Sequence, residues 1–190
     1  KPSFILIKNR QRSVNWLVYD KKNGATKFLY LNVTDAVGTD SGHFNDTEPT
    51  STVFSVGGAN GTNYSGENLI AYCFAEKQGY SKFGNYTGTG NVDGTFVYTG
   101  FSPAMIICKR TDGAGNDWRI IDNKRDFFNV SDARLKPNTS AAEDTNTQLD
   151  FTSNGFKFRA SAGDLNGTST YIYMAFASNP LVTSSGVPAT

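Results

Sequence analysis

The chain repeats four of its apolar segments about 102 residues apart, and this repetition limits the folds that are open to it. Each segment in the first half has a counterpart in the second half at an offset of 101 or 102 positions. The pairs are 2–8 with 103–109, 16–20 with 118–122, 51–56 with 153–158, and 69–75 with 171–177. A repeat at a fixed spacing indicates that one structural unit is present twice. We therefore expect two equivalent halves, 1–76 and 77–178.

The repeated segments are typical of β-strands. They are short runs rich in Val, Ile, Phe, Tyr and Trp, bounded by Gly, Asn, Asp or Pro, which favour turns. The expected strands are 3–8, 14–20, 27–31, 52–56, 68–75, 82–87, 95–99, 104–109, 117–122, 155–160 and 170–177. No segment keeps apolar residues at helical spacing for long, so only short helical turns are expected, near 132–135 and 140–143. The pattern predicts an all-β protein, a two-sheet antiparallel sandwich of the jelly-roll type with internal duplication.

The repeat does not include the segment that joins the two halves. Residues 82–98 have the pattern of a hairpin with a Gly-rich loop, and the first half has no counterpart of it. The first half alone would therefore expose a sheet edge. Either both halves share one core, or a neighbouring chain completes the first half by adding a strand. We favour one continuous sandwich over 1–178, followed by a linker-like tail at 179–190.

The charge of the chain is nearly balanced, with 18 Lys and Arg against 17 Asp and Glu. This balance argues against a nucleic-acid partner, which would require a basic surface. No apolar run approaches the roughly 20 residues of a membrane-spanning helix, so no membrane insertion is expected.

Two tryptophans and two cysteines are expected in the core. Trp16 and Trp118 share a Trp-x-x-x-Asp setting and are predicted to occupy equivalent buried positions. Cys73 and Cys108 lie in apolar, strand-like runs, where a buried thiol acts as a small hydrophobic side chain. A disulfide between the two cysteines is the alternative.

The chain offers little for catalysis. Its one histidine, His43, lies in the polar segment 40–46, and no nucleophile elbow accompanies it. We expect this histidine in an exposed loop. The closely spaced carboxylates of β-sandwich glucanases are absent, and the glutamates are scattered along the chain. The sequence therefore disfavours an enzyme.

Oxygen-bearing side chains gather between residues 112 and 117. Asp112, Asn116 and Asp117 could supply ligands to a hard cation such as calcium, although their spacing is not that of an EF-hand. The alternative is a turn in which Asp and Asn side chains bond to their own backbone. No cofactor is expected, apart from the calcium ion that this segment could hold.

Aromatic residues beside short polar residues are the more useful signal for a ligand. Tyr64, Tyr80 and Tyr86 fall in or next to expected loops, and Asn85 and Asp93 lie among the same polar segments. An exposed ring can stack on the C–H face of a sugar while amides and carboxylates bond its hydroxyl groups. These five residues are the candidate glycan-binding residues. The alternative is that some of the rings alternate into the core.

Several segments resemble a repeat domain of marine bacteriophages, including phages that infect cyanobacteria. The segments are 72–90, 93–103, 107–111, 122–126 and 171–177. The resemblance covers the second half almost fully and the first half less closely. The phage domain occurs in tail-fibre and other virion proteins and is similar to concanavalin-A-like and laminin-G-like sandwiches. The resemblance implies this architecture and a virion setting, with no catalytic residues to carry over.

These observations lead to one functional hypothesis and two alternatives. We expect a non-enzymatic, lectin-like virion protein, a tail-fibre or appendage module that recognises a glycan or protein on the host surface. Its expected location is the virion surface or the extracellular space, in a homo-oligomer with other virion proteins as partners. A purely structural subunit of a capsid decoration or an extracellular assembly is the first alternative. A glycan hydrolase is the weaker alternative.

Overall fold

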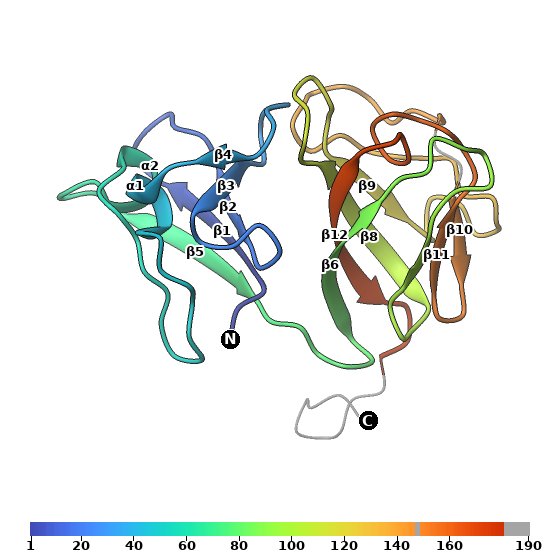
Figure 1. Cartoon of the computed structure of the whole chain (residues 1–190), viewed down its shortest axis with the longest axis horizontal. Coiled ribbons are helices and arrows are strands. Elements are labelled where there is room, and N and C mark those ends of the chain that lie inside the picture. Colours follow the sequence, from blue (N-terminus) through green and yellow to red (C-terminus); the bar gives the residue numbers. More distant parts are fainter. Residues whose placement is uncertain (147–148, 181–190) are drawn as a thin grey trace. The chain divides into compact units, whose positions relative to one another are not determined.

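The computed structural model describes residues 1–146 and 149–180, and its strands form antiparallel sheets (Figure 1). The prediction of an all-β protein is confirmed, because the two helices in these ranges are only four residues long each. Neither helix has the length and apolar character that crossing a membrane requires.

The chain divides into two compact units, Lys1–Ala75 (unit 1) and Glu76–Thr190 (unit 2). The halves expected from the repeat, 1–76 and 77–178, differ from these units by one residue at the boundary. One sandwich formed by both halves stays a prediction. From residue 181 onward, the expected tail lies outside the described residues.

Unit 1 is built on one antiparallel sheet with the strand order β4-β3-β2-β1-β5. Its strands are β1 (Phe4–Asn9), β2 (Leu17–Asp20), β3 (Lys27–Tyr30), β4 (Gly38–Thr39) and β5 (Leu69–Phe74), and its helices are α1 (Ser41–Phe44) and α2 (Asn60–Asn63). Ile5 and Ile7 of β1 are buried in one cluster with Tyr19 of β2 and Phe44 of α1. Alternate residues of a strand point to the same face, so this cluster defines the core face of the sheet.

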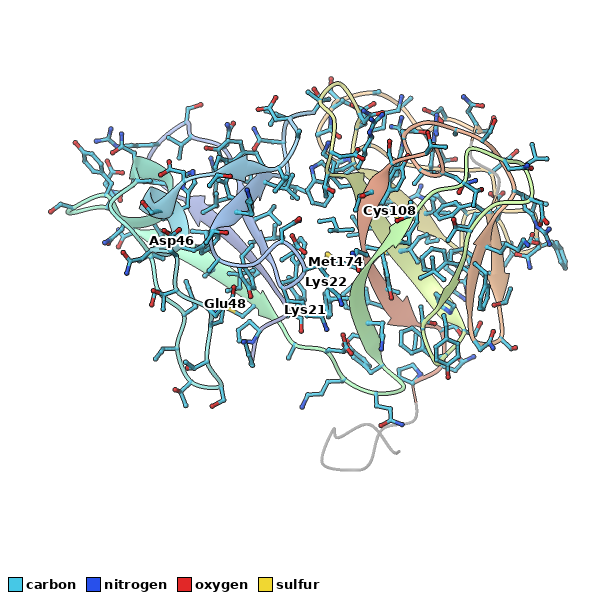
Figure 2. All side chains as sticks on the ribbon, in the orientation of Figure 1. Lys21, Lys22, Asp46, Glu48, Cys108 and Met174 are labelled. Atoms are coloured by element: carbon cyan, nitrogen blue, oxygen red, sulfur yellow. The ribbon has the colours of Figure 1, made fainter. Side chains whose placement is uncertain are left out.

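The carboxylate of Glu48 fastens the loop after α1 to the core of unit 1. Glu48, labelled in Figure 2, accepts a hydrogen bond from the Tyr19 hydroxyl at 2.7 Å. Its other oxygen accepts from the backbone N–H of Ala25, also at 2.7 Å. Because the Glu48 side chain bonds both to β2 and to the turn before β3, it fixes the loop after α1 against the sheet of unit 1.

Unit 2 contains two antiparallel sheets, with the strand orders β6-β12-β8-β9 and β10-β11-β7. The strands are β6 (Ser81–Thr87), β7 (Phe96–Tyr98), β8 (Pro103–Arg110), β9 (Arg119–Asp122), β10 (Leu149–Thr152), β11 (Gly155–Phe158) and β12 (Thr170–Ala177). Side chains of both sheets form one core cluster. Within it, the rings of Tyr173 on β12 and Phe156 on β11 lie edge to face, 5.5 Å apart. The core of unit 2 therefore joins the two sheets.

Three adjacent strands of each unit pair in the same register. β1 lies between β2 and β5, as β8 lies between β9 and β12. The paired residues at the centre are Tyr19, Ile5 and Cys73 in unit 1, and Ile121, Ile106 and Ala175 in unit 2. The counterparts are 101 or 102 positions apart, which is the offset of the sequence repeat. The repeat thus marks equivalent places in two antiparallel triplets of strands.

The turn after β2 in unit 1 and the turn after β9 in unit 2 are also closed in the same way. An aspartate at the strand end accepts hydrogen bonds from two backbone N–H groups that follow it, which is an Asx turn. The donors are Lys22 and Asn23 for Asp20, and Lys124 and Arg125 for Asp122, at 2.9 to 3.2 Å.

The strand expected at 52–56 is not formed. The Thr50 hydroxyl accepts hydrogen bonds from the backbone N–H groups of Thr52 and Val53 and ties the chain into a turn. The prediction was wrong because these local bonds take backbone donors that a β-ladder would need. Phe54 still packs against the core of unit 1, so the apolar pattern was a signal of burial and not of a strand.

Other predicted elements also differ from the structure. The helical turns expected near 132–135 and 140–143 are extended, and the Arg134 N–H donates to the Asp144 carbonyl across a β-bridge at 2.9 Å. The sequence also gave no sign of β4, β10, α1 or α2, which are at most four residues long and lack a periodic apolar pattern.

The expected core positions of the tryptophans and cysteines are only partly correct. Trp118 is buried, whereas Trp16 is half-buried and stacks on the exposed ring of Tyr72, with centroids 6.5 Å apart. Cys108 is buried, whereas Cys73 is exposed, and both are free thiols. Trp16 and Cys73 lie nearer to solvent because β5 is at the edge of its sheet, while β12 is inside its own.

We predict that Phe156→Ala lowers the free energy of unfolding by about 3–5 kcal/mol, because this ring has no exposed surface and fills the core of unit 2. The matched change Phe128→Ala removes a ring that is 86% exposed and should alter stability by less than about 0.5 kcal/mol. Guanidinium unfolding followed by tryptophan fluorescence measures both. Equal losses in the two variants would contradict the placement of Phe156.

Candidate functional site

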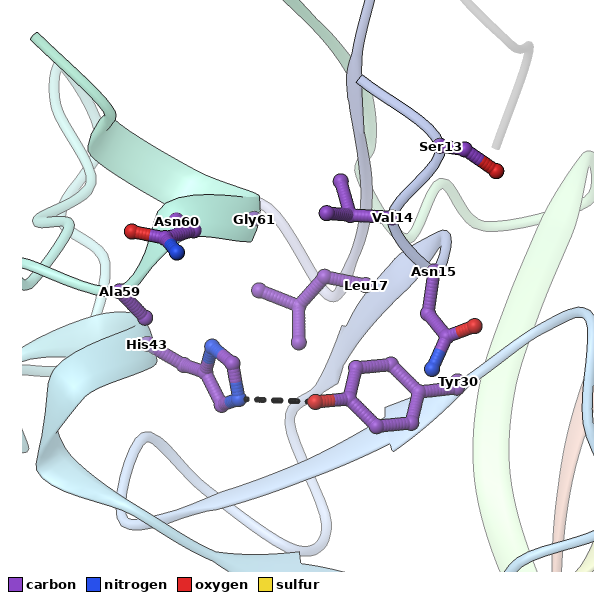
Figure 3. Close-up of a pocket in the computed structure, with 9 residues that line it drawn as sticks. All are labelled: Ser13, Val14, Asn15, Leu17, Tyr30, His43, Ala59, Asn60 and Gly61. Carbon is purple, nitrogen blue, oxygen red and sulfur yellow. Dashed lines mark hydrogen bonds between the residues drawn. The ribbon is translucent and has the colours of Figure 1, made fainter.

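A pocket of about 340 Å³ in unit 1 is the candidate functional site (Figure 3). Its wall combines aromatic, amide, hydroxyl and small apolar side chains with one imidazole. The lining residues are Ser13, Val14, Asn15, Leu17, Tyr30, His43, Ala59, Asn60 and Gly61. They belong to the segment 13–17 that leads into and begins β2, to β3, to α1 and to the segment 59–61 that begins α2. The pocket therefore exists only where these four segments meet.

His43 lies in α1 and is only 7% exposed. The side chain of Asp40 caps this helix by accepting a hydrogen bond from the Gly42 N–H at 2.8 Å. The expectation of an exposed loop histidine is wrong, because the cap turns the polar segment into a helical turn that buries both His43 and Phe44.

The imidazole of His43 contacts two rings of β3. Its Nε2 lies 3.2 Å from the hydroxyl oxygen of Tyr30, and its centroid lies 4.3 Å from that of Phe28. Figure 3 shows the bond to Tyr30, with the other ring nitrogen turned away from it. That nitrogen, Nδ1, is buried without a hydrogen-bond partner among the described residues. Since buried polar atoms are normally bonded, a polar group of a ligand would complete this site.

The backbone holds α1 in place beside the pocket. The Gly57 N–H donates to the His43 carbonyl at 2.8 Å, and the Ala59 N–H donates to the Gly42 carbonyl at 2.9 Å. A Cβ atom at Gly57 would lie 2.4 Å from the Gly42 carbonyl oxygen, so only glycine fits this crossing. The histidine and the start of α2 are therefore fixed relative to each other.

Asn32 fixes the wall of the pocket beside Tyr30. Its side-chain oxygen accepts from the Trp16 N–H at 2.8 Å, and its side-chain nitrogen donates to the Asn15 Oδ1 at 2.9 Å. The Asn15 amide is thus held through its oxygen. Figure 3 shows the Asn15 nitrogen directed toward Tyr30, where it can donate to a ligand.

Unit 2 repeats these bonds at the counterpart positions. Asn138 accepts from the Trp118 N–H at 2.9 Å and donates to the Asp117 Oδ1 at 2.8 Å. The shared register and these bonds give three counterpart pairs: Asn15 and Asp117, Leu17 and Arg119, and Tyr30 and Lys136. One wall of the pocket, formed by Asn15, Leu17 and Tyr30, therefore has the same backbone arrangement in unit 2, with different side chains.

The three counterparts in unit 2 are charged and bind one another. Arg119 donates to Asp117 at 3.1 Å and also pairs with Asp164, and Lys136 lies 3.9 Å from Asp117. Burial by itself would raise the pKa of Asp117, but its bonds to Asn138 and Arg119 outweigh burial and lower it. Unit 1 carries neutral residues at these positions, so its pocket can accept a neutral polar ligand without breaking a buried ion pair.

The three predicted calcium ligands lie in turns and ion pairs. Asp112 pairs with Arg110 at 2.8 Å and accepts from the Thr170 N–H at 2.9 Å. Asn116 donates to the backbone carbonyl two residues before it, at 3.1 Å, as the turn alternative expects. The basic side chains that pair with Asp112 and Asp117 would compete with a metal ion for these carboxylates. In residues 1–146 and 149–180, no three His, Cys, Asp or Glu side chains are grouped for a metal.

Tyr86 is a core residue, and its proposed role at the surface is corrected. Its ring is buried and stacks on Tyr171, with centroids 5.0 Å apart. Its hydroxyl donates to the Leu165 carbonyl at 2.7 Å. The alternation of residues along β6 turns this ring inward, while its neighbour Asn85 is exposed.

The other candidate glycan-binding residues do not form one cluster. Tyr64 belongs to unit 1, where the Arg12 guanidinium lies 3.6 Å from its centroid and covers one face of the ring. In unit 2, Tyr80 is exposed just before β6 and Asn85 lies within that strand, roughly 16 Å further along. Asp93 is exposed and pairs with a lysine of β11 at 2.6 Å. Any role of these four residues in binding stays a prediction.

A second hollow, of about 420 Å³, lies in unit 2 beside the exposed ring of Tyr98. Its lining residues are Glu76, Lys77, Gln78, Gly79, Ser81, Lys82, Tyr98, Thr99, Gly100 and Phe101. This hollow carries charged side chains, so it differs in chemistry from the neutral pocket of unit 1.

Sequence reasoning missed Asn15, Tyr30 and Asn60, which are far apart in the chain and meet through sheet pairing and the placement of α2. One signal was available. The repeat aligns Asn15 with Asp117, a change from a neutral to a charged residue at a matched position beside the repeated tryptophan. Such a change indicates that the two copies differ in chemistry at this place.

A family described as "Domain of unknown function (DUF7483)" matches residues 1–180. The chain belongs to this family. No curated protein matches the chain, and no solved structure matches it either. The match of the DUF7483 family covers unit 1 entirely and unit 2 up to residue 180. The family description names no activity, so the function of this DUF7483 domain has to be argued from its own site.

We predict that the pKa of His43 lies below its ordinary value of 6.5, because burial disfavours the charged imidazole more than the nearby Asp40 favours it. The unfolded chain then binds a proton below about pH 6.5 that the native state binds only at lower pH. The stability of unit 1 should therefore fall as pH drops below this value. NMR titration of the single histidine measures the pKa directly.

The control for this prediction is His43→Gln, which cannot titrate. Urea unfolding at neutral and mildly acidic pH should show a weaker loss of stability on acidification in the variant than in the native chain. A native His43 pKa at or above 6.5 would contradict the prediction.

Proposed function

We propose that this domain is a non-catalytic carbohydrate-binding module and that the pocket of unit 1 is its sugar site. The observation that carries the proposal is the composition of the pocket wall: one tyrosine ring, two amides, a hydroxyl and a neutral imidazole, with no charged group. A sugar presents hydroxyl groups around an apolar C–H face, and this mixture of groups matches both.

The size of the pocket favours a small polar ligand. Its volume of about 340 Å³ lies at the lower end of the range of roughly 300–1,000 Å³ for ligand pockets. Tyr30 offers a ring on one side, and Asn15 and Asn60 offer amides for hydroxyl groups. The unpartnered Nδ1 of His43 adds one further hydrogen-bonding atom. A terminal sugar residue of a glycan fits this description better than a long chain does.

The same wall argues for binding without cleavage. Glycoside hydrolysis generally requires two carboxyl groups about 5–9.5 Å apart across the scissile bond, and no Asp or Glu lines this pocket. A serine nucleophile would need a hydrogen bond to its base, but Figure 3 shows the Ser13 hydroxyl pointing away from His43. These features favour a lectin-like role over a hydrolase.

We further propose a bacteriophage setting, with the domain as a tail-fibre or appendage module at the virion surface. The resemblance of segments 72–90 and 93–103 to a phage repeat domain supports this proposal. A host-surface glycan would then be the ligand, and other virion proteins would be the partners. Such modules act in oligomers, in which many weak sugar contacts add up to strong attachment.

The architecture that we propose is a duplicated, concanavalin-A-like sandwich. The matched registers of the two strand triplets support duplication, and the single core cluster between the two sheets of unit 2 supports the sandwich. Unit 1 has the triplet without a second sheet among its described residues.

A purely structural role is the second candidate function. It is favoured by one observation, the exposed edge strand β5, whose apolar side chains Ile70 and Tyr72 are accessible. A subunit of an assembly would use such a strand for contacts between chains.

A glycan array with the purified chain tests the proposed function. We expect binding to a restricted set of glycans, and Tyr30→Ala and Asn60→Ala should each weaken it by at least about tenfold, or roughly 1.4 kcal/mol. The matched control Tyr98→Ala removes an exposed tyrosine in unit 2 and should leave binding unchanged. Loss of binding in the control alone would move the site to unit 2, and release of reducing sugar would show a hydrolase.

A further inference from the structure

The outer edge of β5 has no strand beside it among the described residues, because β5 is the last strand of its sheet. The N–H of Arg10 donates to the Asn68 carbonyl at 3.0 Å. This bond lies one residue pair beyond the last pair of β1 and β5, which is Asn9 with Leu69. Hydrogen-bonded pairs alternate along an antiparallel ladder, so every second residue from Asn68 faces β1. The backbone groups of Leu69, Ala71 and Cys73 therefore point outward.

The counterpart edge in unit 2 is occupied by a strand. β12 pairs with the antiparallel strand β6 along seven residues. The counterparts of Leu69, Ala71 and Cys73 are Tyr171, Tyr173 and Ala175, which face β6. These three are buried, whereas Ala71 and Cys73 are exposed. The same edge of the same strand triplet thus accepts an antiparallel strand in unit 2 and is open in unit 1.

The sequence of β5 does nothing to protect this edge. Leu69–Phe74 contains no charge and no proline. Natural edge strands commonly carry such residues, which prevent pairing with other chains. Ile70 and Tyr72 are instead 37% and 45% exposed. An uncharged, apolar edge with free backbone groups is suited to strand pairing.

We propose that β5 pairs antiparallel with β5 of a second copy of this chain, across a two-fold axis at Ala71. Ala71 then faces its own counterpart and Leu69 faces the second copy's Cys73, and both pairs are hydrogen-bonded through the outward backbone groups. Ile70 faces the second copy's Tyr72, which buries an apolar cross-strand pair. One sheet runs through both copies.

The charges near β5 are compatible with this register. Glu67 lies just before the strand and is already bound by Asn9 at 2.6 Å and by Arg12. In the paired state it lies opposite the second copy's Ala75 and not opposite another acid. Like charges directly opposite each other would weaken a strand pair, and none meet here. This proposal does not rest on the sugar site, which other segments form.

Sedimentation velocity of the full chain between about 1 µM and 1 mM tests the pairing. We expect a monomer–dimer equilibrium, and Ala71→Lys should weaken the dimer by at least about tenfold because it places two charges at the axis. The matched control is Ala141→Lys, the same change at an exposed alanine of unit 2, which should leave the dimer unchanged. A native chain that stays monomeric throughout would overturn the proposal.

A cross-link tests the register. Two hydrogen-bonded antiparallel residues have Cα atoms about 5.5 Å apart, which lies within the range for a disulfide. In a Cys73→Ser background, Ala71→Cys should form a disulfide dimer with oxidised glutathione, while Ala141→Cys should not. Cys108 is buried and burial raises the pKa of its thiol to about 12, so it stays unreactive.

Two further outcomes would reject the proposal, one with a dimer and one with a monomer. A dimer that persists in Ala71→Lys, without a cross-link in Ala71→Cys, would use another surface. A monomer that binds a synthetic peptide of residues 80–88, which carries the β6 sequence, would show that the edge takes a strand of that type and not a second β5.

Discussion

The pairing of one central strand with two antiparallel neighbours is the constraint on which both units depend. β1 bonds to β2 and β5 at once, and β8 bonds to β9 and β12. Ile5 and Ile106 are the residues at the centre of these triplets, and neither has exposed surface. A shift of register by one residue would turn them out of the core, so burial and backbone pairing fix each other. The turns, the pocket and the open edge take their positions from these triplets.

The two triplets pair in the same register but carry different chemistry beside it. An asparagine side chain links the tryptophan backbone to the residue before it in both units, Asn32 in unit 1 and Asn138 in unit 2. In unit 2 that residue is Asp117, which joins a network of partly buried ion pairs. In unit 1 it is Asn15, which borders a neutral pocket. Charged residues that bind each other use their hydrogen-bonding capacity within the protein, whereas neutral polar groups that lack such partners can bond to a ligand.

The open edge of β5 and the pocket proposed to bind sugar are separate features of unit 1. The pocket is formed by α1, α2, β3 and the segment before β2, while the edge is formed by β5 alone. A dimer paired through β5 would therefore carry two copies of the pocket, and β5 lines neither of them. For a module that binds glycans, two linked sites would raise the strength of attachment without any new contact to sugar. The two proposals are thus compatible, although each is tested separately.

The sequence by itself determined the β class and the places of the main strands. Their short apolar runs, ended by turn residues, and the repeat spacing are local signals that need no knowledge of distant contacts. Only the tertiary structure decided that His43 is buried beside Tyr30, because a helix cap and a sheet bring them together. It also decided that segment 69–75 is exposed and segment 171–177 is buried, although the two segments are alike. Burial depends on whether another strand and another sheet cover a segment, and that information lies outside the segment itself.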